Sequence, residues 1–163
     1  LTHNSDVAQS SQMRISKQAW IREHRFCEIF MDIAMVMNQQ NLWNLDIQGV
    51  EPIQYGIYPE GGKYDWHVDQ HPKPVYWVAD NPSDKGMVRK ISMTLFMNDP
   101  SEYEGGEFDL ELYKPETDCR YETFKLKKAS AIFFQSDQWH RVRPVTSGIR
   151  KSIVAWFYGP PYK

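Results

Sequence analysis

The sequence predicts a single, mainly β domain, a sandwich or barrel with one supporting helix. Its length of 163 residues suits one hydrophobic core, and its 14% aromatic content is typical of strands. After "NLWN" the hydrophobic pattern changes from a helical period to short strand-like runs, which turn signals separate. One helix followed by about ten strands predicts this architecture.

The N-terminal quarter is predicted to contain an arm and then the helix. Residues 1–15 are expected to form a loosely ordered arm. Residues 16–40 are expected to be helical, with Ser16 as the N-cap. Apolar side chains recur there at i, i+3, i+4 and i+7, so one face should pack against the sheet. These residues are Phe26, Ile29, Phe30, Ile33, Ala34 and Met37.

The strands are expected to form a core over residues 45–158. Turn signals such as "PEGG", "DNPSDKG" and "NDPSEYEGG" divide this region. The predicted strands are 45–50, 52–58, 63–69, 75–79, 88–98, 106–112, 120–126, 130–135, 139–143 and 149–158. The longest polar insertion, 70–86, has the length of a lid or a binding loop.

The composition of the chain argues against several classes of binding partner and against a membrane location. A net charge of −2 gives no reason to expect nucleic-acid binding, and no apolar run approaches the ~18 residues of a membrane span. Cys27 and Cys119 match no zinc-site spacing and are interpreted as free thiols. The chain begins at Leu1 with a polar stretch that lacks the features of a signal peptide. We therefore expect a cytoplasmic protein that is a monomer or a weak dimer.

A histidine and an aspartate stand two residues apart in "YDWHVDQ", residues 64–70. In a regular strand, His67 and Asp69 would point to one side together with Lys63 and Asp65. Such a pair supplies two metal ligands, but taken alone it is more typical of the solvated face of an ordinary strand. The motif alone therefore leaves both interpretations open.

His140 and Arg150 change that balance. His140 opens a predicted strand and can complete a set of two histidines and one carboxylate, which non-heme Fe(II) oxygenases use with open metal positions. Zinc hydrolases use similar ligands, but they give no role to Arg150. If Arg150 is buried near a metal, its guanidinium fork suits the far carboxylate of an organic dianion. Without the metal set, Arg150 would be interpreted as a surface residue.

The ordered set His67, Asp69, His140 and Arg150 resembles the Fe(II)/2-oxoglutarate-dependent dioxygenase superfamily. The segments "YPEGGKYDWHVD", "YEGGEFDL" and "HRVRPVTSGIRKSIVAWF" resemble its prolyl 4-hydroxylase-like branch, especially small microbial and viral members, over residues 50–158. The resemblance implies a double-stranded β-helix, or jelly roll, with the metal between its two sheets. It also implies Fe(II), 2-oxoglutarate and O2 as cofactor and cosubstrates, with ascorbate as a further candidate.

The resemblance assigns roles to individual residues. His67, Asp69 and His140 would be the catalytic metal ligands, and Arg150 would bind the distal carboxylate of 2-oxoglutarate. Ser152 would add a hydroxyl there, while Tyr58 and Trp156 would line the same pocket. Core packing is the alternative role for Tyr58 and Trp156.

The expected reaction is hydroxylation of an unactivated C–H bond, with release of succinate and CO2. A prolyl residue in a peptide or protein is the first candidate substrate, and a free amino acid or another small metabolite is the alternative. Candidate substrate-contacting residues are Trp66, Gln70, Tyr76, Trp77 and Trp139. A nucleic-acid demethylase is disfavoured because Trp156 stands where that group carries a second arginine. A jelly-roll module that binds a metal or ligand without catalysis is the alternative from a different class.

Overall fold

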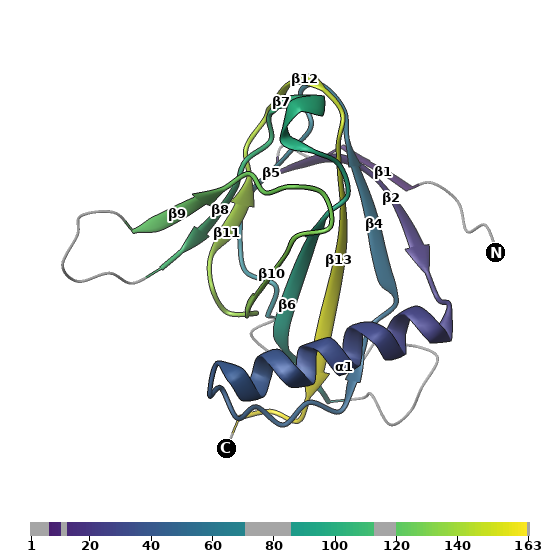
Figure 1. Ribbon diagram of the computed structural model, residues 1–163, viewed down its shortest axis with the longest axis vertical. Coiled ribbons are helices and arrows are strands. Elements are labelled where there is room, and N and C mark those ends of the chain that lie inside the picture. The colour runs from purple at the N-terminus through teal and green to yellow at the C-terminus, as the bar shows by residue number, and fades with distance from the viewer. Residues whose placement is uncertain (1–6, 11–12, 71–85, 113–119, 163) are drawn as a thin grey trace.

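The computed structural model describes residues 7–10, 13–70, 86–112 and 120–162. One curled, antiparallel sheet forms most of it and runs in the order β10-β6-β13-β4-β2-β5-β11-β8-β9 (Figure 1). Strand β1 extends the sheet beside β2, and β3 pairs with the end of β13. The prediction of a mainly β architecture is confirmed.

The central strands are those that the hydrophobic pattern predicts. The first half of the sheet contains β4 (Ile53–Tyr58), β6 (Val88–Phe96), β10 (Ala131–Gln135) and β13 (Arg150–Gly159). The second half contains β5 (Lys63–His67), β8 (Phe108–Glu111), β9 (Tyr121–Phe124) and β11 (His140–Val142). Of the predicted strand 45–50, only β3 (Gly49–Val50) forms, and the predicted strand 75–79 lies outside the described residues.

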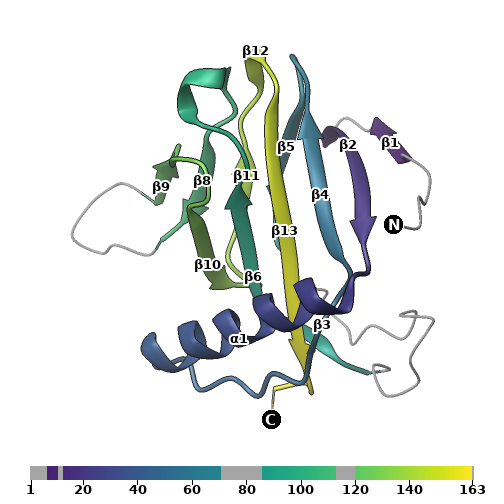
Figure 2. The same cartoon turned by 45° about the vertical axis from the view of Figure 1, so that its right-hand side comes forward.

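The two halves meet through β2 (Arg14–Ile21), which pairs with β4 on one side and with β5 on the other. Figure 2 shows β2 and β4 side by side, with β1 (Val7–Ser10) at the edge. The predicted helix start at Ser16 is therefore wrong, as is the loose arm for residues 7–10 and 13–15. In β2 the buried positions Arg14, Ser16 and Gln18 are polar, whereas Ile15 is 38% exposed. Buried and exposed residues therefore alternate along β2, but the buried ones are not hydrophobic.

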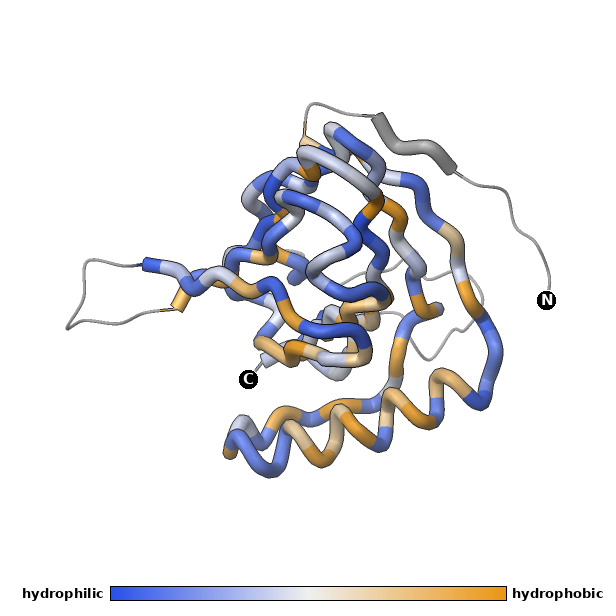
Figure 3. Tube along the Cα trace, turned by 45° about the horizontal axis from the view of Figure 1, so that its top comes forward, coloured by the Kyte–Doolittle hydropathy of each residue, from blue (hydrophilic) through white to orange (hydrophobic). Residues whose placement is uncertain are grey.

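The helix α1 (His24–Gln40) begins eight residues later than predicted and crosses one end of the sheet (Figure 1). Ala34 is fully buried, and Cys27, Phe30 and Met31 pack beside it against Ile53, Ile91 and Phe157. The predicted face is partly wrong, because Phe26, Ile29 and Ile33 are exposed. Figure 3 shows the cause: apolar residues recur around much of the helix, so their spacing does not select one side.

Asn38 fixes the end of α1. Its side-chain amide donates to the Leu45 carbonyl at 2.8 Å and accepts from the Leu45 N–H at 3.0 Å. The helix is thereby tied to the segment that enters β3. No helix in the described ranges is long and apolar enough to cross a membrane.

A second hydrophobic cluster lies between the two halves of the sheet. Its buried residues are Tyr58, Phe96, Phe108, Leu110, Phe134, Val142 and Val145. Above it, a short helix, η2 (Pro100–Glu102), leads into β7 (Tyr103–Gly105), which pairs with β12 (Val145–Gly148). The sequence did not predict β7 or β12 as strands. This small ribbon closes the end of the sandwich next to Arg150, since Gly106 directly follows β7 and a Cβ added there would lie 3.0 Å from Arg150 Cδ.

Candidate active site

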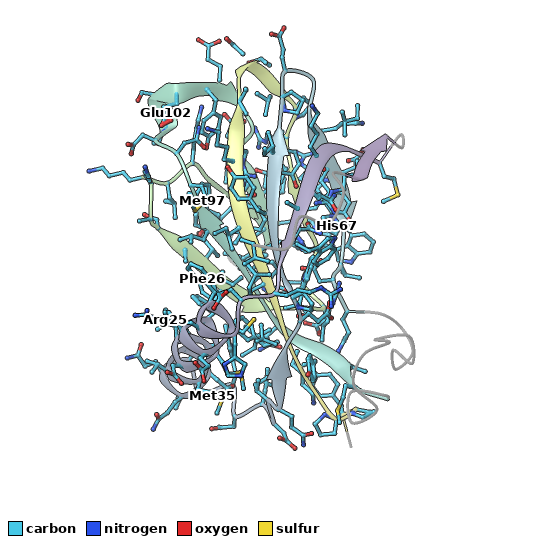
Figure 4. All side chains as sticks on the ribbon, turned by 90° about the vertical axis from the view of Figure 1, so that its right-hand side faces the viewer. Arg25, Phe26, Met35, His67, Met97 and Glu102 are labelled. Carbon is cyan, nitrogen blue, oxygen red and sulfur yellow. The ribbon has the colours of Figure 1, made fainter. Side chains whose placement is uncertain are left out.

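A bulge in β5 shapes the site. His67 pairs with His140 and Tyr64 with Val142, so three steps along β5 match two steps along β11. This extra residue changes the strict alternation: Tyr64 and His67 line one cavity, while Asp65 is exposed. The predicted common face of Lys63, Asp65, His67 and Asp69 is therefore wrong for Lys63 and Asp65, which pair with each other at 3.6 Å and do not line the cavity. His67 lies far from α1 residues Phe26 and Met35 (Figure 4).

Asp69 lies just after β5 and is held by the backbone. Its N–H donates to the Ser136 carbonyl at 2.9 Å, and the N–H of Gln70 donates to the same oxygen at 2.8 Å. These two hydrogen bonds place Asp69 opposite the start of β11, whose first residue is His140. The three predicted ligands thus meet where β5 ends and β11 begins.

His67, Asp69 and His140 form a compact group of metal-ligand atoms. The Nε2 atom of His67 lies 3.8 Å from Oδ1 of Asp69, and the Nε2 atom of His140 lies 3.4 Å from Oδ2. One ligand atom from each residue falls within 4.8 Å of the others. Two imidazoles and one carboxylate can bind one side of a metal ion and leave other positions open.

Both histidines have their second ring nitrogen occupied. Nδ1 of His67 lies 2.7 Å from the Asp65 carbonyl oxygen, and Nδ1 of His140 lies 3.0 Å from that of Gln138. A carbonyl can only accept, so each Nδ1 carries the proton and donates, leaving the Nε2 lone pair for a metal. The orientation of both rings therefore suits coordination.

Burial and charge keep His67 and Asp69 in their metal-binding forms. Burial, with the neighbouring His140, lowers the pKa of His67 to about 4. Burial acts to raise the pKa of Asp69, but its electrostatic interactions with His140, His67 and Arg89 outweigh burial and lower that pKa. A neutral imidazole and an ionised carboxylate are the forms that bind metals.

Arg150 lies in the same cavity as the three ligands. Only 1% of it is exposed, and its guanidinium carbon lies 5.2 Å from the centre of the Tyr58 ring and 5.5 Å from that of Phe96. One amino group donates to Ser152 Oγ at 3.1 Å. Within the described ranges, its Nε and Nη2 have no hydrogen-bond partner. Burial lowers the pKa of Arg150, and a buried cation with unused donors is suited to an anionic ligand.

Tyr103 is a site residue that sequence reasoning missed. Its buried hydroxyl lies beside the Arg150 guanidinium without forming a hydrogen bond of good geometry among the described residues, and the charge and donors of Arg150 act to lower its pKa against the larger effect of burial, which raises it. Tyr103 reaches this position because η2 and β7 bend over the cavity end. The only sequence signal was the quoted segment "YEGGEFDL", whose glycines permit that bend.

A second missed group supports Trp156. The guanidinium of Arg89 lies 4.0 Å from the centre of the Trp156 ring. Arg89 also binds Glu51 through two contacts of 2.6 Å and donates to the Asp69 carbonyl at 3.4 Å. Trp156 in turn is one of the groups that lower the pKa of Asp69. No motif marked Arg89 or Glu51, which stand 38 residues apart in the chain.

The remaining predicted residues fall into two groups. Tyr58, Ser152 and Trp156 line the cavity with the ligands and Arg150. Trp66 and Trp139 instead line a separate groove with Tyr121 and Arg143, and that groove shares no described lining residue with the cavity. Gln70 donates to the Arg89 carbonyl at 3.2 Å. Tyr76 and Trp77 lie outside the described residues.

Known proteins share this sequence pattern and this fold. A model of the 2OG-Fe(II) oxygenase superfamily matches residues 53–158. A PKHD-type hydroxylase of Teredinibacter turnerae is 32% identical over 107 residues, which are 66% of this chain and 42% of that protein. The chain thus spans about two fifths of the length of the curated relatives it matches.

Two solved structures agree in fold. A prolyl-4-hydroxylase of Pseudomonas putida gives a TM-score of 0.66 at 20% identity, covering 93% of this chain and 75% of that one. A viral collagen prolyl hydroxylase of Paramecium Bursaria Chlorella virus-1, in its 2OG complex, gives 0.65 at 21% identity and covers 90% of this chain and 80% of that one. The predicted jelly roll is confirmed.

Proposed function

The chain belongs to the 2OG-Fe(II) oxygenase superfamily, and on this premise we propose that it hydroxylates an unactivated C–H bond. His67, Asp69 and His140 would hold Fe(II), and Arg150 would bind the distal carboxylate of 2-oxoglutarate. When bound, the iron and 2-oxoglutarate supply the oxidation, which uses O2 and releases succinate and CO2.

One observation carries this proposal: a single cavity contains both the three metal-ligand residues and a buried guanidinium with unused donors. The metal set alone would fit a zinc site equally well. A buried arginine with no carboxylate partner among the described residues is costly in the free protein, so it favours an anionic ligand in the functional state.

The chain's own residues would bind and orient the cosubstrate. The Nε and Nη2 donors of Arg150 would pair with the two oxygens of one carboxylate. Ser152 Oγ already holds the third corner of the guanidinium, and the Tyr103 hydroxyl is available beside it. On the metal side, Phe108, Phe134 and Val142 line the cavity and would limit the access of water.

For the substrate, we propose a prolyl residue in a peptide or protein. The support is the fold shared with proteins described as prolyl hydroxylases. The Teredinibacter turnerae relative carries the broader description of a PKHD-type hydroxylase. A free amino acid or a small metabolite is the alternative within the same chemistry.

The first experiment tests the metal and cosubstrate. Anaerobic addition of Fe(II) and 2-oxoglutarate should produce a visible metal-to-ligand charge-transfer band, which His140→Ala should abolish. His24→Ala is the matched control, because His24 lies on the exposed start of α1. The assignment fails if the wild type gives no band or if the band survives in His140→Ala.

The second experiment tests catalysis and substrate class. Succinate release is measured with proline-rich peptides, free proline and a set of other amino acids. Stimulation by proline-rich peptides supports the prolyl proposal, whereas stimulation by non-peptide compounds alone would overturn it and leave the oxygenase in place. A charge-transfer band without any succinate release would identify a non-catalytic binding module.

A further inference from the structure

The N-terminal strand β2 contributes a side chain to the metal cavity, although it lies outside residues 53–158, which the family model matches. Arg14, at the start of β2, is directly opposite Tyr64 of β5 in the antiparallel pairing. Tyr64 is three residues before His67, and the β5 bulge brings both to the cavity side. The three residues therefore meet in space.

Arg14, Tyr64 and His67 form a continuous stack. The guanidinium carbon of Arg14 lies 4.5 Å from the centre of the Tyr64 ring. On this ring stacks the imidazole of His67, with 3.5 Å between ring centres and 14° between planes. The tyrosine ring thus bridges a cation and a metal-ligand ring.

Hydrogen bonds hold the outer member of the stack. Arg14 donates from Nε to Ser16 Oγ at 2.9 Å and from Nη2 to the Gln54 side-chain oxygen at 2.7 Å. Arg14 is also largely buried. These contacts come from β2 and β4, so the plane of the guanidinium is fixed by the strands on the far side of Tyr64.

The imidazole of His67 needs this support. Its Nδ1 hydrogen bond to the Asp65 carbonyl fixes one edge of the ring, and the tilted His140 ring, with 4.1 Å between ring centres, contacts it without lying parallel to it. Face-to-face packing on Tyr64 restrains the plane of the His67 ring and directs Nε2 toward Asp69 and the metal position. Groups that orient a metal-bound histidine typically change metal affinity by about 10–100-fold when removed.

We propose that Arg14 is a positioning residue, which sets the orientation of His67 through Tyr64 and so makes β2 part of the metal centre. The inference rests on the proposed role of His67 as a metal ligand. It assigns a function at the site to a segment that the family match does not include.

The test measures Mn(II) affinity by electron paramagnetic resonance of the unbound ion, using the full chain. Arg14→Met should weaken binding about tenfold, and Tyr64→Leu should weaken it by at least as much. Tyr64→Phe should bind like the wild type, because it keeps the ring. Lys17→Met is the matched control: Lys17 lies on the same strand, is exposed and should have no effect.

The double variant separates positioning from general destabilisation. If Arg14 acts through Tyr64, Arg14→Met should cause no further loss of affinity in a Tyr64→Leu background. Independent, multiplying losses would overturn the proposal. So would wild-type affinity in Arg14→Met, or equal losses in Tyr64→Phe and Tyr64→Leu.

A metal-free measurement keeps this test apart from the proposed function. The ring-proton resonances of His67, assigned with His67→Asn, should show an upfield ring-current shift in the wild type, Lys17→Met and Tyr64→Phe. The shift should shrink in Arg14→Met, even if the protein bound no Mn(II). An unchanged shift in Arg14→Met would overturn the positioning role. If the shift behaves as expected but the protein binds no Mn(II), the result counts against the metal centre alone.

Discussion

Arg89 and Glu51 are joined by two contacts of 2.6 Å, Nε to Oε1 and Nη2 to Oε2, and Arg89 covers the Trp156 ring at 4.0 Å. Both side chains are close to buried, with 12% and 11% exposed. A bidentate pair in this setting is directional and resists rearrangement. It links β6 and the segment before β4 to the wall of the metal cavity.

Glu51→Gln should destabilise the protein. The change leaves the Arg89 guanidinium without its charge partner at a mostly buried position, which typically costs up to about 3 kcal/mol of unfolding free energy. Urea unfolding of the metal-free protein measures this cost. Trp156 fluorescence should also change, since its cation partner is released.

Glu60→Gln is the matched control, because Glu60 is exposed and lies in the turn before β5. A loss of stability in Glu51→Gln that is no larger than in Glu60→Gln would show that the pair contributes nothing measurable. In that case Arg89 must be held by its other contacts, the Trp156 ring and the Asp69 carbonyl.

Arg150→Met should affect stability and cosubstrate binding in opposite directions. The substitution removes a buried cation with unused donors, so the metal-free protein should gain about 1–3 kcal/mol of unfolding free energy. 2-Oxoglutarate binding, followed by the charge-transfer band, should be lost. A stability loss in Arg150→Met would contradict the view that Arg150 is maintained for its ligand.

Lys151→Met, on the other side of β13, should change neither property by much. Arg150→Lys keeps the charge but loses the planar fork, and it should weaken 2-oxoglutarate binding by about one to two orders of magnitude. Unchanged binding in Arg150→Lys would show that charge alone suffices at this end of the cavity.

Sequence patterns predicted those strands that carry runs of apolar residues. Strands β4, β6 and β13 are examples, although each also buries polar residues, such as Gln54, Ser92 and Ser152. Strand β2 was missed because its buried residues Arg14, Ser16 and Gln18 are all polar, so hydrophobicity does not mark its buried side. The helix face was misassigned because α1 is apolar on more than one side.

The residues of the site also fall into those that the sequence predicts and those that it does not. His67, Asp69 and His140 could be proposed from the sequence because few residue types bind metals and their spacing is restricted. Tyr103, Arg89 and Arg14 could not, since tyrosine and arginine are common and the contacts depend on the curl of the sheet. The β5 bulge, which brings Tyr64 beside His67, lies in a strand without glycine or proline, the residues that usually mark such an irregularity.

Gly106→Ala should impair both stability and 2-oxoglutarate binding. Gly106 has φ +64°, and an added Cβ would lie 3.0 Å from Arg150 Cδ and 3.0 Å from Val145 Cγ2. The backbone strain should cost about 1–2 kcal/mol, and displacement of Arg150 should weaken cosubstrate binding in addition.

Gly61→Ala separates these two effects. Gly61 has φ +76°, but an added Cβ would meet nothing within 4 Å. It should therefore show the backbone cost in urea unfolding while 2-oxoglutarate binding remains normal. Equal 2-oxoglutarate affinity in both variants would show that contact with Gly106 does not position Arg150.

Asp109 should make the protein sensitive to acid. It is 0% exposed and accepts hydrogen bonds from Arg141 Nε at 2.7 Å, Arg143 Nε at 2.8 Å and Thr123 Oγ1 at 2.7 Å. Burial acts to raise its pKa, but the hydrogen bonds from Arg143, Thr123 and Arg141 outweigh burial and lower it. The group therefore binds its proton less readily in the folded state than in the unfolded state.

The sign of the pH dependence follows from this difference. Stability from Asp109 is fully present above the unfolded-state pKa of about 4 and is lost as the pH falls toward the lower folded-state pKa. Asp109→Asn should be less stable than the wild type at pH 7, because two arginines lose their common partner. The gap should narrow below about pH 4, where the wild type loses the same contribution.

Urea unfolding between pH 3 and 7 tests this expectation, with Asp32→Asn on the exposed side of α1 as the control. The control should follow the wild type throughout. The stability difference between Asp109→Asn and the wild type could instead stay constant over this range. The carboxylate charge would then be unimportant, and Asp109 would act through hydrogen bonding and shape, which an asparagine only partly reproduces.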